Sequence, residues 1–122
     1  MRNISVIKDR STLRILEDVK REITKSLGDK VKEAVLYGSY ARDEQTRDSD
    51  IDIVVFYDSR IFNRMFIREK LADIKVDLSL KYDVVMSILL KDYRQYIRFR
   101  ESVPFYSDIY MEGVALYDQP QY

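Results

Sequence analysis

Apolar residues near the start of the chain recur at helical spacing. They follow a capping candidate, Asp9 or Ser11, and Gly28 stands where such a helix would end. The apolar positions are Leu13, Leu16, Val19, Ile23 and Leu27. Because residues three or four apart share one face of a helix, this spacing predicts an amphipathic helix that ends near Gly28.

Two short and nearly continuous apolar runs come next, and each is typical of a buried β-strand. The first spans residues 31–37, and the second spans residues 51–57 and is rich in β-branched side chains. A polar stretch over residues 38–49 joins them, in which residues 40–44 have room for one helical turn.

The following segment admits two interpretations. Its helical stripe comprises Ile67, Leu71, Ile74 and Leu78. Alternation typical of a strand is also present, at Ile74, Val76, Leu78 and Leu80. Two regular helical turns precede the ambiguous stretch, which favours a helix from about residue 61 to residue 81 and then a strand over residues 83–90.

Three more elements are expected toward the end of the chain. A helix rich in Tyr and Arg is predicted over residues 91–102, a short helix opened by Pro104 over 105–111, and a strand over 114–117. The order of elements predicts an α/β (α+β) protein in which helices pack on a small mixed sheet, as a single domain over residues 1–122.

Composition narrows the available chemistry. The chain has no cysteine and no histidine, which excludes thiolate and imidazole catalysis and leaves oxygen ligands for Mg²⁺, Mn²⁺ or Ca²⁺. Its formal net charge is zero, which argues against non-specific binding of nucleic acid. The N-terminal segment lacks the apolar core of a signal peptide and no run reaches membrane-spanning length, so a cytoplasmic protein is expected.

Two carboxylates stand at the start of the second apolar run. Side chains alternate along a strand, so Asp50 and Asp52 are expected on one face with Cα atoms roughly 6.5–7 Å apart. Such a pair can hold one metal ion or bridge two, as phosphoryl transfer requires. The ordinary alternative is a pair of solvated residues at a strand end.

A Gly-Ser turn ends the first apolar run. Gly38 lets the backbone approach a phosphate without a Cβ in the way, and the Ser39 hydroxyl can add a donor. Arg42, in the same loop, suits either a triphosphate contact or an ion pair with a loop carboxylate. Arg47 favours the ion pair.

Together these residues carry a resemblance to a known family. The pattern GS-x10-D-x-D, formed here by Gly38, Ser39, Asp50 and Asp52, resembles the signature of minimal nucleotidyltransferases of the DNA polymerase β superfamily. The flanking VLYGSYARDE and SDIDIVV, and the C-terminal FYSDIYMEGVALYD, are similar to that family too. The resemblance implies a polymerase β-like fold that transfers AMP, or another NMP, from ATP or another NTP with Mg²⁺ or Mn²⁺. Asp50 and Asp52 would bind metal, and Gly38, Ser39 and Arg42 would contact the phosphates.

The resemblance also implies a third catalytic, metal-binding carboxylate on a neighbouring strand. Asp83 is the first candidate because it begins the predicted strand 83–90, and Asp77 replaces it if residues 74–80 form the strand instead. Many relatives have glycine where this chain has Asp43, which predicts a differently shaped turn after Arg42.

For partners, the resemblance implies a small helical HEPN protein encoded beside the chain, with this chain as the antitoxin that adds AMP to a tyrosine of the toxin. A chain of this length lacks a separate acceptor domain, so a partner or a second copy would supply the acceptor surface. Seven of the ten tyrosines lie from Tyr82 onward, a composition that suits a contact surface or half-buried packing. Neutralisation of a partner by contact alone, and modification of a small molecule, remain open alternatives.

Overall fold

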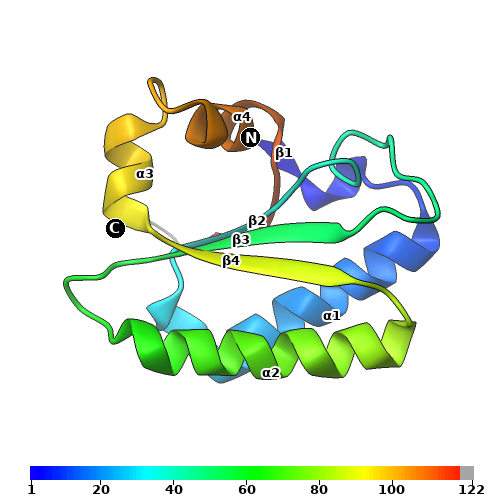
Figure 1. The fold of residues 1–122 in the computed structure, drawn as a ribbon, viewed down its shortest axis with the longest axis horizontal. Coiled ribbons are helices and arrows are strands. Elements are labelled where there is room, and N and C mark those ends of the chain that lie inside the picture. The colour runs from blue at the N-terminus through cyan, green and yellow to red at the C-terminus, as the bar shows by residue number, and fades with distance from the viewer. Residues whose placement is uncertain (119–122) are drawn as a thin grey trace.

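A five-stranded mixed sheet forms the centre of the protein, in a computed structural model that describes residues 1–118 (Figure 1). The strands are β1 (Arg2–Asn3), β2 (Glu33–Tyr37), β3 (Ile51–Tyr57), β4 (Met86–Asp92) and β5 (Val114–Asp118). They lie in the order β1-β5-β2-β3-β4. The central strand β3 pairs antiparallel with β2 and parallel with β4, while β5 pairs antiparallel with β2 and parallel with β1.

Helices cover both faces of this sheet, in pairs. The α-helices are α1 (Arg10–Leu27), α2 (Arg64–Tyr82), α3 (Tyr93–Phe99) and α4 (Pro104–Glu112), and the short 3-10 turns are η1 (Ile4–Val6) and η2 (Gly28–Lys30). Figure 1 shows α1 and α2 on one face and α3 and α4 on the other. The mixed α/β architecture expected from the sequence is confirmed. Within residues 1–118, no helix is both long and apolar enough to cross a membrane.

Local sequence signals set the ends of the two long helices. The Asp9 carboxylate accepts hydrogen bonds from the Thr12 amide at 3.1 Å and the Thr12 hydroxyl at 2.7 Å, which caps α1. Gly28 ends that helix with φ of 50°. Asn63 caps α2 through the Met65 amide at 2.8 Å. Both caps satisfy amides that the first helical turn cannot pair internally.

Burial on both faces fixes β3 in place. Ile53, Val55 and Tyr57 belong to the core cluster shared with α1 and α2, whereas Val54 and Phe56 belong to the cluster beneath α3 and α4. Phe56 stacks on Tyr96 of α3, with ring centroids 4.2 Å apart. A strand held between two cores has little freedom to shift, and its polar N-terminal end is therefore held in a defined position.

A buried carboxylate joins the two helices below the sheet. Asp18 of α1 accepts hydrogen bonds from the Tyr82 hydroxyl, from Lys81 Nζ at 2.9 Å and from Arg21. The Tyr82 hydrogen bond and then the Lys81 hydrogen bond lower the pKa of Asp18 to about 2, against an opposing effect of burial. The ionised carboxylate therefore ties α1 to the C-terminal turn of α2.

Side-chain exposure shows that residues 74–80, for which both a helix and a strand were considered, are helical. Ile74 and Leu78 are buried against the sheet, whereas Val76 is 55% exposed and Leu80 is 78% exposed. An alternating strand would place all four on one face, so the strand interpretation is wrong. The helical stripe was the correct guide.

Two strand assignments need correction. The strand predicted over residues 83–90 begins at Met86, because Asp83 takes a left-handed conformation (φ 52°, ψ 50°) that ends α2. The Val84 amide then donates to the Ser79 carbonyl, and the chain enters the sheet only after this turn. The two-residue strand β1, which pairs with β5, was not predicted, because so short a segment carries no periodicity.

Candidate active site

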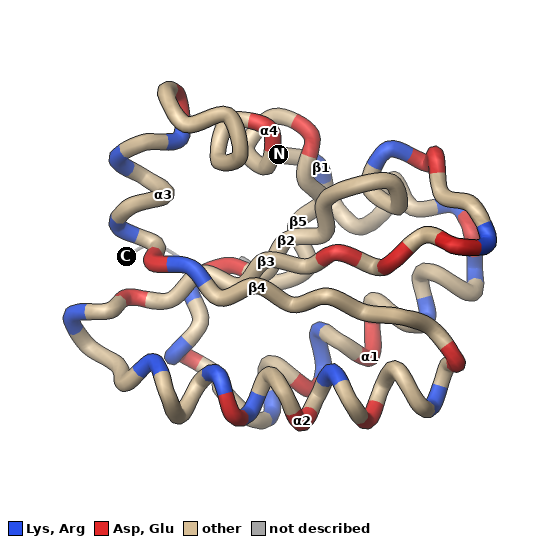
Figure 2. Tube along the Cα trace, viewed as in Figure 1, with Lys and Arg blue, Asp and Glu red and all other residues tan. Residues whose placement is uncertain are grey.

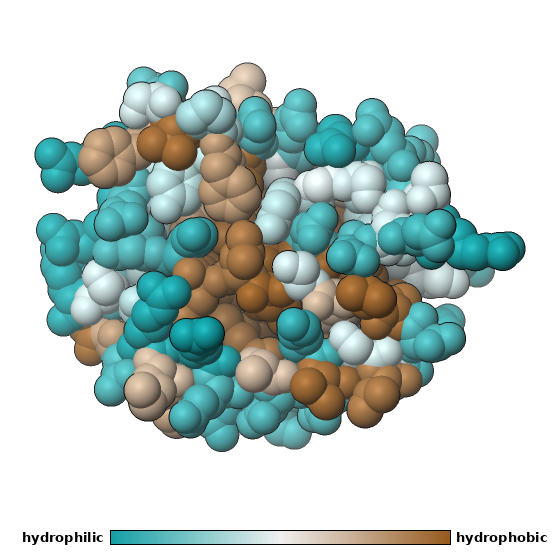
Figure 3. Space-filling view, in the orientation of Figure 1, coloured by the Kyte–Doolittle hydropathy of each residue, from teal (hydrophilic) through white to brown (hydrophobic). Residues whose placement is uncertain are grey.

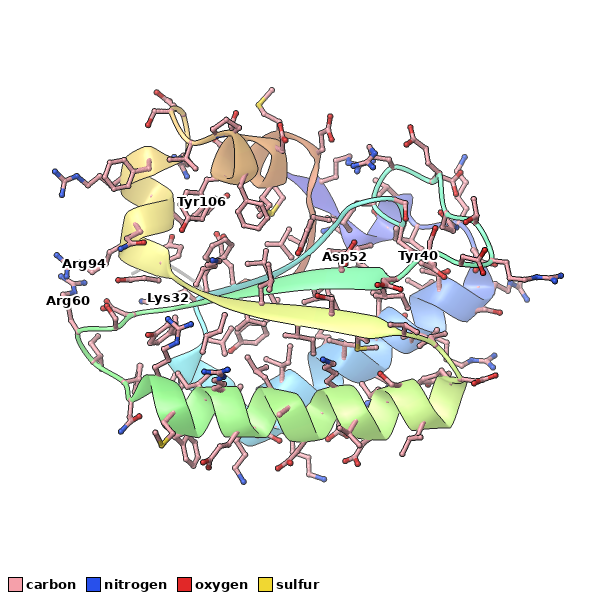
Figure 4. All side chains as sticks on the ribbon, viewed as in Figure 1. Lys32, Tyr40, Asp52, Arg60, Arg94 and Tyr106 are labelled. Carbon is pink, nitrogen blue, oxygen red and sulfur yellow. The ribbon has the colours of Figure 1, made fainter. Side chains whose placement is uncertain are left out.

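Asp50 and Asp52 lie at the N-terminal end of β3, next to the loop that follows β2. Asp52 is opposite Tyr37 on β2 and Ser87 on β4, and Asp50 directly precedes the strand. By strand alternation both carboxylates share the face of Val54, the side covered by α3 and α4. Figure 4 shows Asp52 on β3 with Tyr40 in the neighbouring loop, while Arg60 and Arg94 lie at the opposite end of the sheet.

Gly38 packs directly against the Asp52 carboxylate. A Cβ added at Gly38 would lie 2.5 Å from Asp52 Oδ2 and 3.4 Å from Asp52 Cγ. Gly38 also has φ of 76°, in the left-handed region that favours glycine. Two independent constraints, conformation and contact, therefore require glycine here and place the turn beside the carboxylate.

Burial and a like charge perturb the Asp52 carboxyl. Its pKa is raised, chiefly by desolvation and then by the charge of Asp50. The pKa of the Tyr37 hydroxyl is also raised, by burial and then by the charge of Asp52. A concentration of negative charge in a half-buried setting is what a bound cation would relieve.

The turn after Gly38 leaves hydrogen-bond donors free beside this charge. Ala41 and Arg42 amides donate back to the Gly38 carbonyl at 3.1 and 3.3 Å, and the Glu44 amide donates to the Ser39 carbonyl at 2.9 Å. Within residues 1–118, neither the Ser39 and Tyr40 amides nor the Ser39 hydroxyl has a hydrogen-bond partner. The loop forms hydrogen-bonded turns over residues 38–43 instead of the helical turn expected at residues 40–44, and the first residues of the turn offer donors suited to an anion.

Arg42 and Asp43 complete the loop. Arg42 Nε donates to Glu44 at 3.1 Å, and its Nη1 lies 4.0 Å from a Glu112 carboxylate oxygen. Of the two roles considered for Arg42, the structure thus shows the ion pair with a loop carboxylate. About half of the Arg42 side chain remains exposed and available to a ligand. Asp43 has φ of 56°, so its backbone takes the left-handed conformation that a glycine would also take. The differently shaped turn predicted from this residue is therefore not required.

A small cavity of about 120 Å³ opens between this turn and α4. Its lining includes Gly38, Arg42, Phe105, Asp108 and Glu112. The Arg2 side chain donates to the backbone carbonyls of Ala41 and Glu112, which joins the turn to the end of α4. Arg2 and the two α4 carboxylates did not stand out in the sequence, because only the fold brings them to the motif.

The proposed third carboxylate does not join the pair. Asp83 lies at the exposed C-terminal end of α2 rather than on a strand, and Asp77 is exposed on α2 itself. Ser87, not an acidic residue, is opposite Asp52 on β4. Among the residues that the structure describes, no three acidic side chains are grouped closely enough to hold a metal ion. The placement of Asp83 is thus corrected, for the same reason that β4 starts late.

The donor set nonetheless suits a hard divalent cation. Asp50 and Asp52 offer only carboxylate oxygens, and the whole chain has no His or Cys to favour a softer metal. Oxygen pairs of this kind, completed by water and substrate phosphates, are the usual protein contribution to Mg²⁺ sites in phosphoryl-transfer enzymes.

Comparisons with known proteins agree with this geometry. The family model described as the nucleotidyltransferase domain matches residues 16–115. A Methanocaldococcus jannaschii protein, provisionally named a protein adenylyltransferase, is 40% identical over 82 residues, which span 60% of this chain and 82% of that protein. A second such protein from the same organism is 38% identical over 89 residues, spanning 69% and 95%.

Solved structures share the fold at low sequence identity. A crystal structure of a toxin–antitoxin with AMP-PNP aligns with a TM-score of 0.57 and 18% identity, covering 87% of this chain and 75% of that one. A Sulfolobus solfataricus protein provisionally described as a nucleotidyltransferase aligns with a TM-score of 0.51 and 17% identity, covering 89% and 85%.

Proposed function

Because the chain belongs to the nucleotidyltransferase domain family, we propose that it transfers AMP, or another nucleoside monophosphate, from a nucleoside triphosphate to a separate acceptor. The packing of the Asp52 carboxylate against the Gly38 turn carries this proposal. It brings a carboxylate pair and a set of free backbone donors together at one end of the sheet. Nucleotidyl transfer needs both, one for a cation and the other for phosphate oxygens.

Each part of the site has a role in this reaction. Asp50 and Asp52 would hold Mg²⁺ or Mn²⁺, which when bound neutralises charge on the phosphate oxygens. The Ser39 hydroxyl and the amides of Ser39 and Tyr40 would donate to phosphate oxygens, and Arg42 would turn from its carboxylate partners toward the triphosphate. An acceptor oxygen forms a bond to the α-phosphorus as the bond to pyrophosphate breaks, and the acceptor hydroxyl gives its proton to water.

We place the acceptor on a protein. The M. jannaschii relatives named as protein adenylyltransferases support a protein acceptor, and the toxin–antitoxin neighbour with AMP-PNP supports an ATP-like donor. By the resemblance of the motif, the acceptor would be a tyrosine hydroxyl of a small helical HEPN toxin. The chain would then act as the antitoxin.

Neutralisation by contact alone is the second candidate. Two observations favour it: the residue opposite Asp52 on β4 is a serine, and Asp83 ends α2 instead of lying on a strand. By the family resemblance, a third carboxylate would be expected there to activate the acceptor. In that case the carboxylate pair would be a remnant of catalysis and the partner would be held without modification.

Intact-mass spectrometry separates the two candidates. The helical protein encoded beside this chain would be incubated with the chain, ATP and Mg²⁺, with Asp52→Asn as the matched control. A mass gain of one or more AMP units that is absent from the control would support transfer. A stable complex without any mass gain would support neutralisation by contact.

A further inference from the structure

The outer edge of β4 is an unpaired side of the sheet. β4 spans seven residues, stands last in the strand order and pairs only with β3 within the described chain. In Figure 1 it is the strand nearest the viewer, with no element in front of it. About half of the backbone donors and acceptors of an edge strand point outward, where another strand can pair with them.

The sequence of β4 lacks the usual protection of such an edge. Its charged residues, Lys91 and Asp92, stand at its C-terminal end, and the run Met86–Leu90 is Met-Ser-Ile-Leu-Leu. Natural edge strands are commonly shielded by a central charge, a proline or a bulge. Figure 3 looks onto this edge and shows hydrophobic residues gathered along β4 and in the hollow between β4 and α2. An unprotected apolar edge of this kind indicates a partner.

Beside this edge lies a groove of about 330 Å³ with an apolar floor and a basic rim. Leu71, Ala72, Ile88 and Leu90 line its apolar floor, and Arg64, Arg68 and Lys75 of α2 line its basic rim. Leu89 and Lys91 border the groove from β4, but strand alternation directs their side chains to the other face of the sheet. Within residues 1–118, none of the three rim cations forms an ion pair.

Basic and acidic side chains lie on different sides of α2. The residues of α2 that line the groove, at positions 64, 68, 71, 72 and 75, form one face of the helix and include Arg64, Arg68 and Lys75. The acidic positions of α2 lie along the side turned away from β4 (Figure 2). A ligand in the groove thus meets basic side chains without facing the helix carboxylates.

We propose that the β4 edge and this groove bind an extended acidic segment of a partner protein, which adds to β4 as a further strand. Its backbone would pair with the free edge, and its side chains on the face toward α2 would include apolar ones against the groove floor and carboxylates against the basic rim. A second copy of this chain fits poorly, because antiparallel pairing of two β4 strands would bring the two basic rims together. The surface is distinct from the cavity beside Gly38, so the proposal does not depend on nucleotidyl transfer.

The register of β4 places this surface relative to the carboxylate pair. Ser87 is opposite Asp52 in the parallel β3–β4 pair, so a strand added to β4 would lie about 10 Å from β3, two strand spacings away. The groove residues Ile88–Lys91 are opposite Ile53–Phe56, so a partner seated in the groove lies toward the end of the sheet away from Asp52.

A peptide with a fluorescein label tests the proposal. The probe is an eight-residue synthetic peptide in which Glu and Val take turns at every second position, with Thr between them, so that both residue types face α2. Fluorescence anisotropy measures its affinity. The Arg68→Glu/Lys75→Glu variant should bind it about tenfold more weakly or worse, because two attractive contacts become repulsive. The Lys20→Glu/Lys25→Glu variant makes the same charge change on exposed positions of α1 and should bind like the unmodified chain.

Hydrogen exchange supplies the readout for strand addition. Peptide binding should slow exchange of outward-facing β4 amides, and a peptide with N-methylated backbone amides should bind much more weakly. The proposal is overturned if the acidic peptide fails to bind, if a Lys-Val peptide binds equally well, or if both double variants lose affinity alike. Light scattering that shows a dimer through β4, or charge-dependent capture of an RNA oligonucleotide in place of the peptide, would also overturn it.

Discussion

The Gly38–Asp52 contact gives the sharpest prediction, which concerns Gly38→Ala. The new Cβ would lie 2.5 Å from Asp52 Oδ2, whereas ordinary contacts begin at 3.4 Å, so the carboxylate or the turn must move by about 0.9 Å. A misplacement of about 1 Å at a reacting centre can cost roughly 100-fold in rate. The left-handed backbone at φ of 76° adds a cost of about 1–2 kcal/mol in folding free energy for a residue with a Cβ.

Gly28→Ala is the matched control. Gly28 also has positive φ, at 50°, but a Cβ there would meet nothing within 4 Å. Both variants should lose stability through backbone strain at positive φ, each with a fall in Tm of at least about 3 °C, as measured by thermal unfolding. Only Gly38→Ala should lose transfer activity, by about 100-fold in an AMP-transfer assay well below Tm.

The reasoning fails if Gly38→Ala, while folded, keeps activity close to that of the unmodified chain. It also fails if Gly28→Ala loses activity to the same extent, because the loss would then follow from backbone strain and not from the contact with Asp52. Nucleotide affinity, measured in parallel, would show whether the damage lies in binding or in the chemical step.

Three further predictions concern carboxylates. Burial and Asp50 raise the pKa of Asp52, so Asp52→Asn should raise Tm at pH 7. That advantage should shrink as the pH falls through the raised pKa and be gone once the pH reaches 3.8; an unchanged difference across pH would contradict this. Asp18→Asn should destabilise the protein by about 1–2 kcal/mol at neutral pH in denaturant unfolding. That loss should fade between pH 3.8 and about 2, since the lowered pKa of Asp18 contributes stability only while the group is ionised. Asp83→Asn should leave AMP transfer within about twofold, because the exposed helix end is off the strand and asparagine tolerates left-handed backbone; complete loss would restore Asp83 to the site.

Signals that act within a few residues predicted most of the fold. Asp9 and Gly28 bound α1 where capping chemistry places them, and β3 spans the residues that its apolar run indicates. The sequence motif also assigns the Gly38 turn and Asp52 to one site, and β2–β3 pairing brings them into contact. In each case the local sequence and the tertiary contacts favour the same structure.

The remaining features depend on contacts between distant segments or on backbone conformation. Asp83 shows the second case, because a left-handed helix end at an aspartate gives no apolar pattern and Val84 and Val85 resemble the start of a strand. Arg2 shows the first case, because its place beside the site follows from β1 pairing with β5 at the far end of the chain. The β4 groove likewise combines α2 with a strand that comes later in the sequence.

The contacts of Arg2 also determine whether sequence comparison could detect that it lies beside the motif loop. Its guanidinium binds the main-chain carbonyls of Ala41 and Glu112, which every amino acid provides. Positions 41 and 112 can therefore change side chain without losing the contact, and no compensating change at position 2 is required. Methods that infer proximity from correlated substitutions would therefore miss the contacts of Arg2 with the motif loop and α4, because both acceptors are backbone atoms.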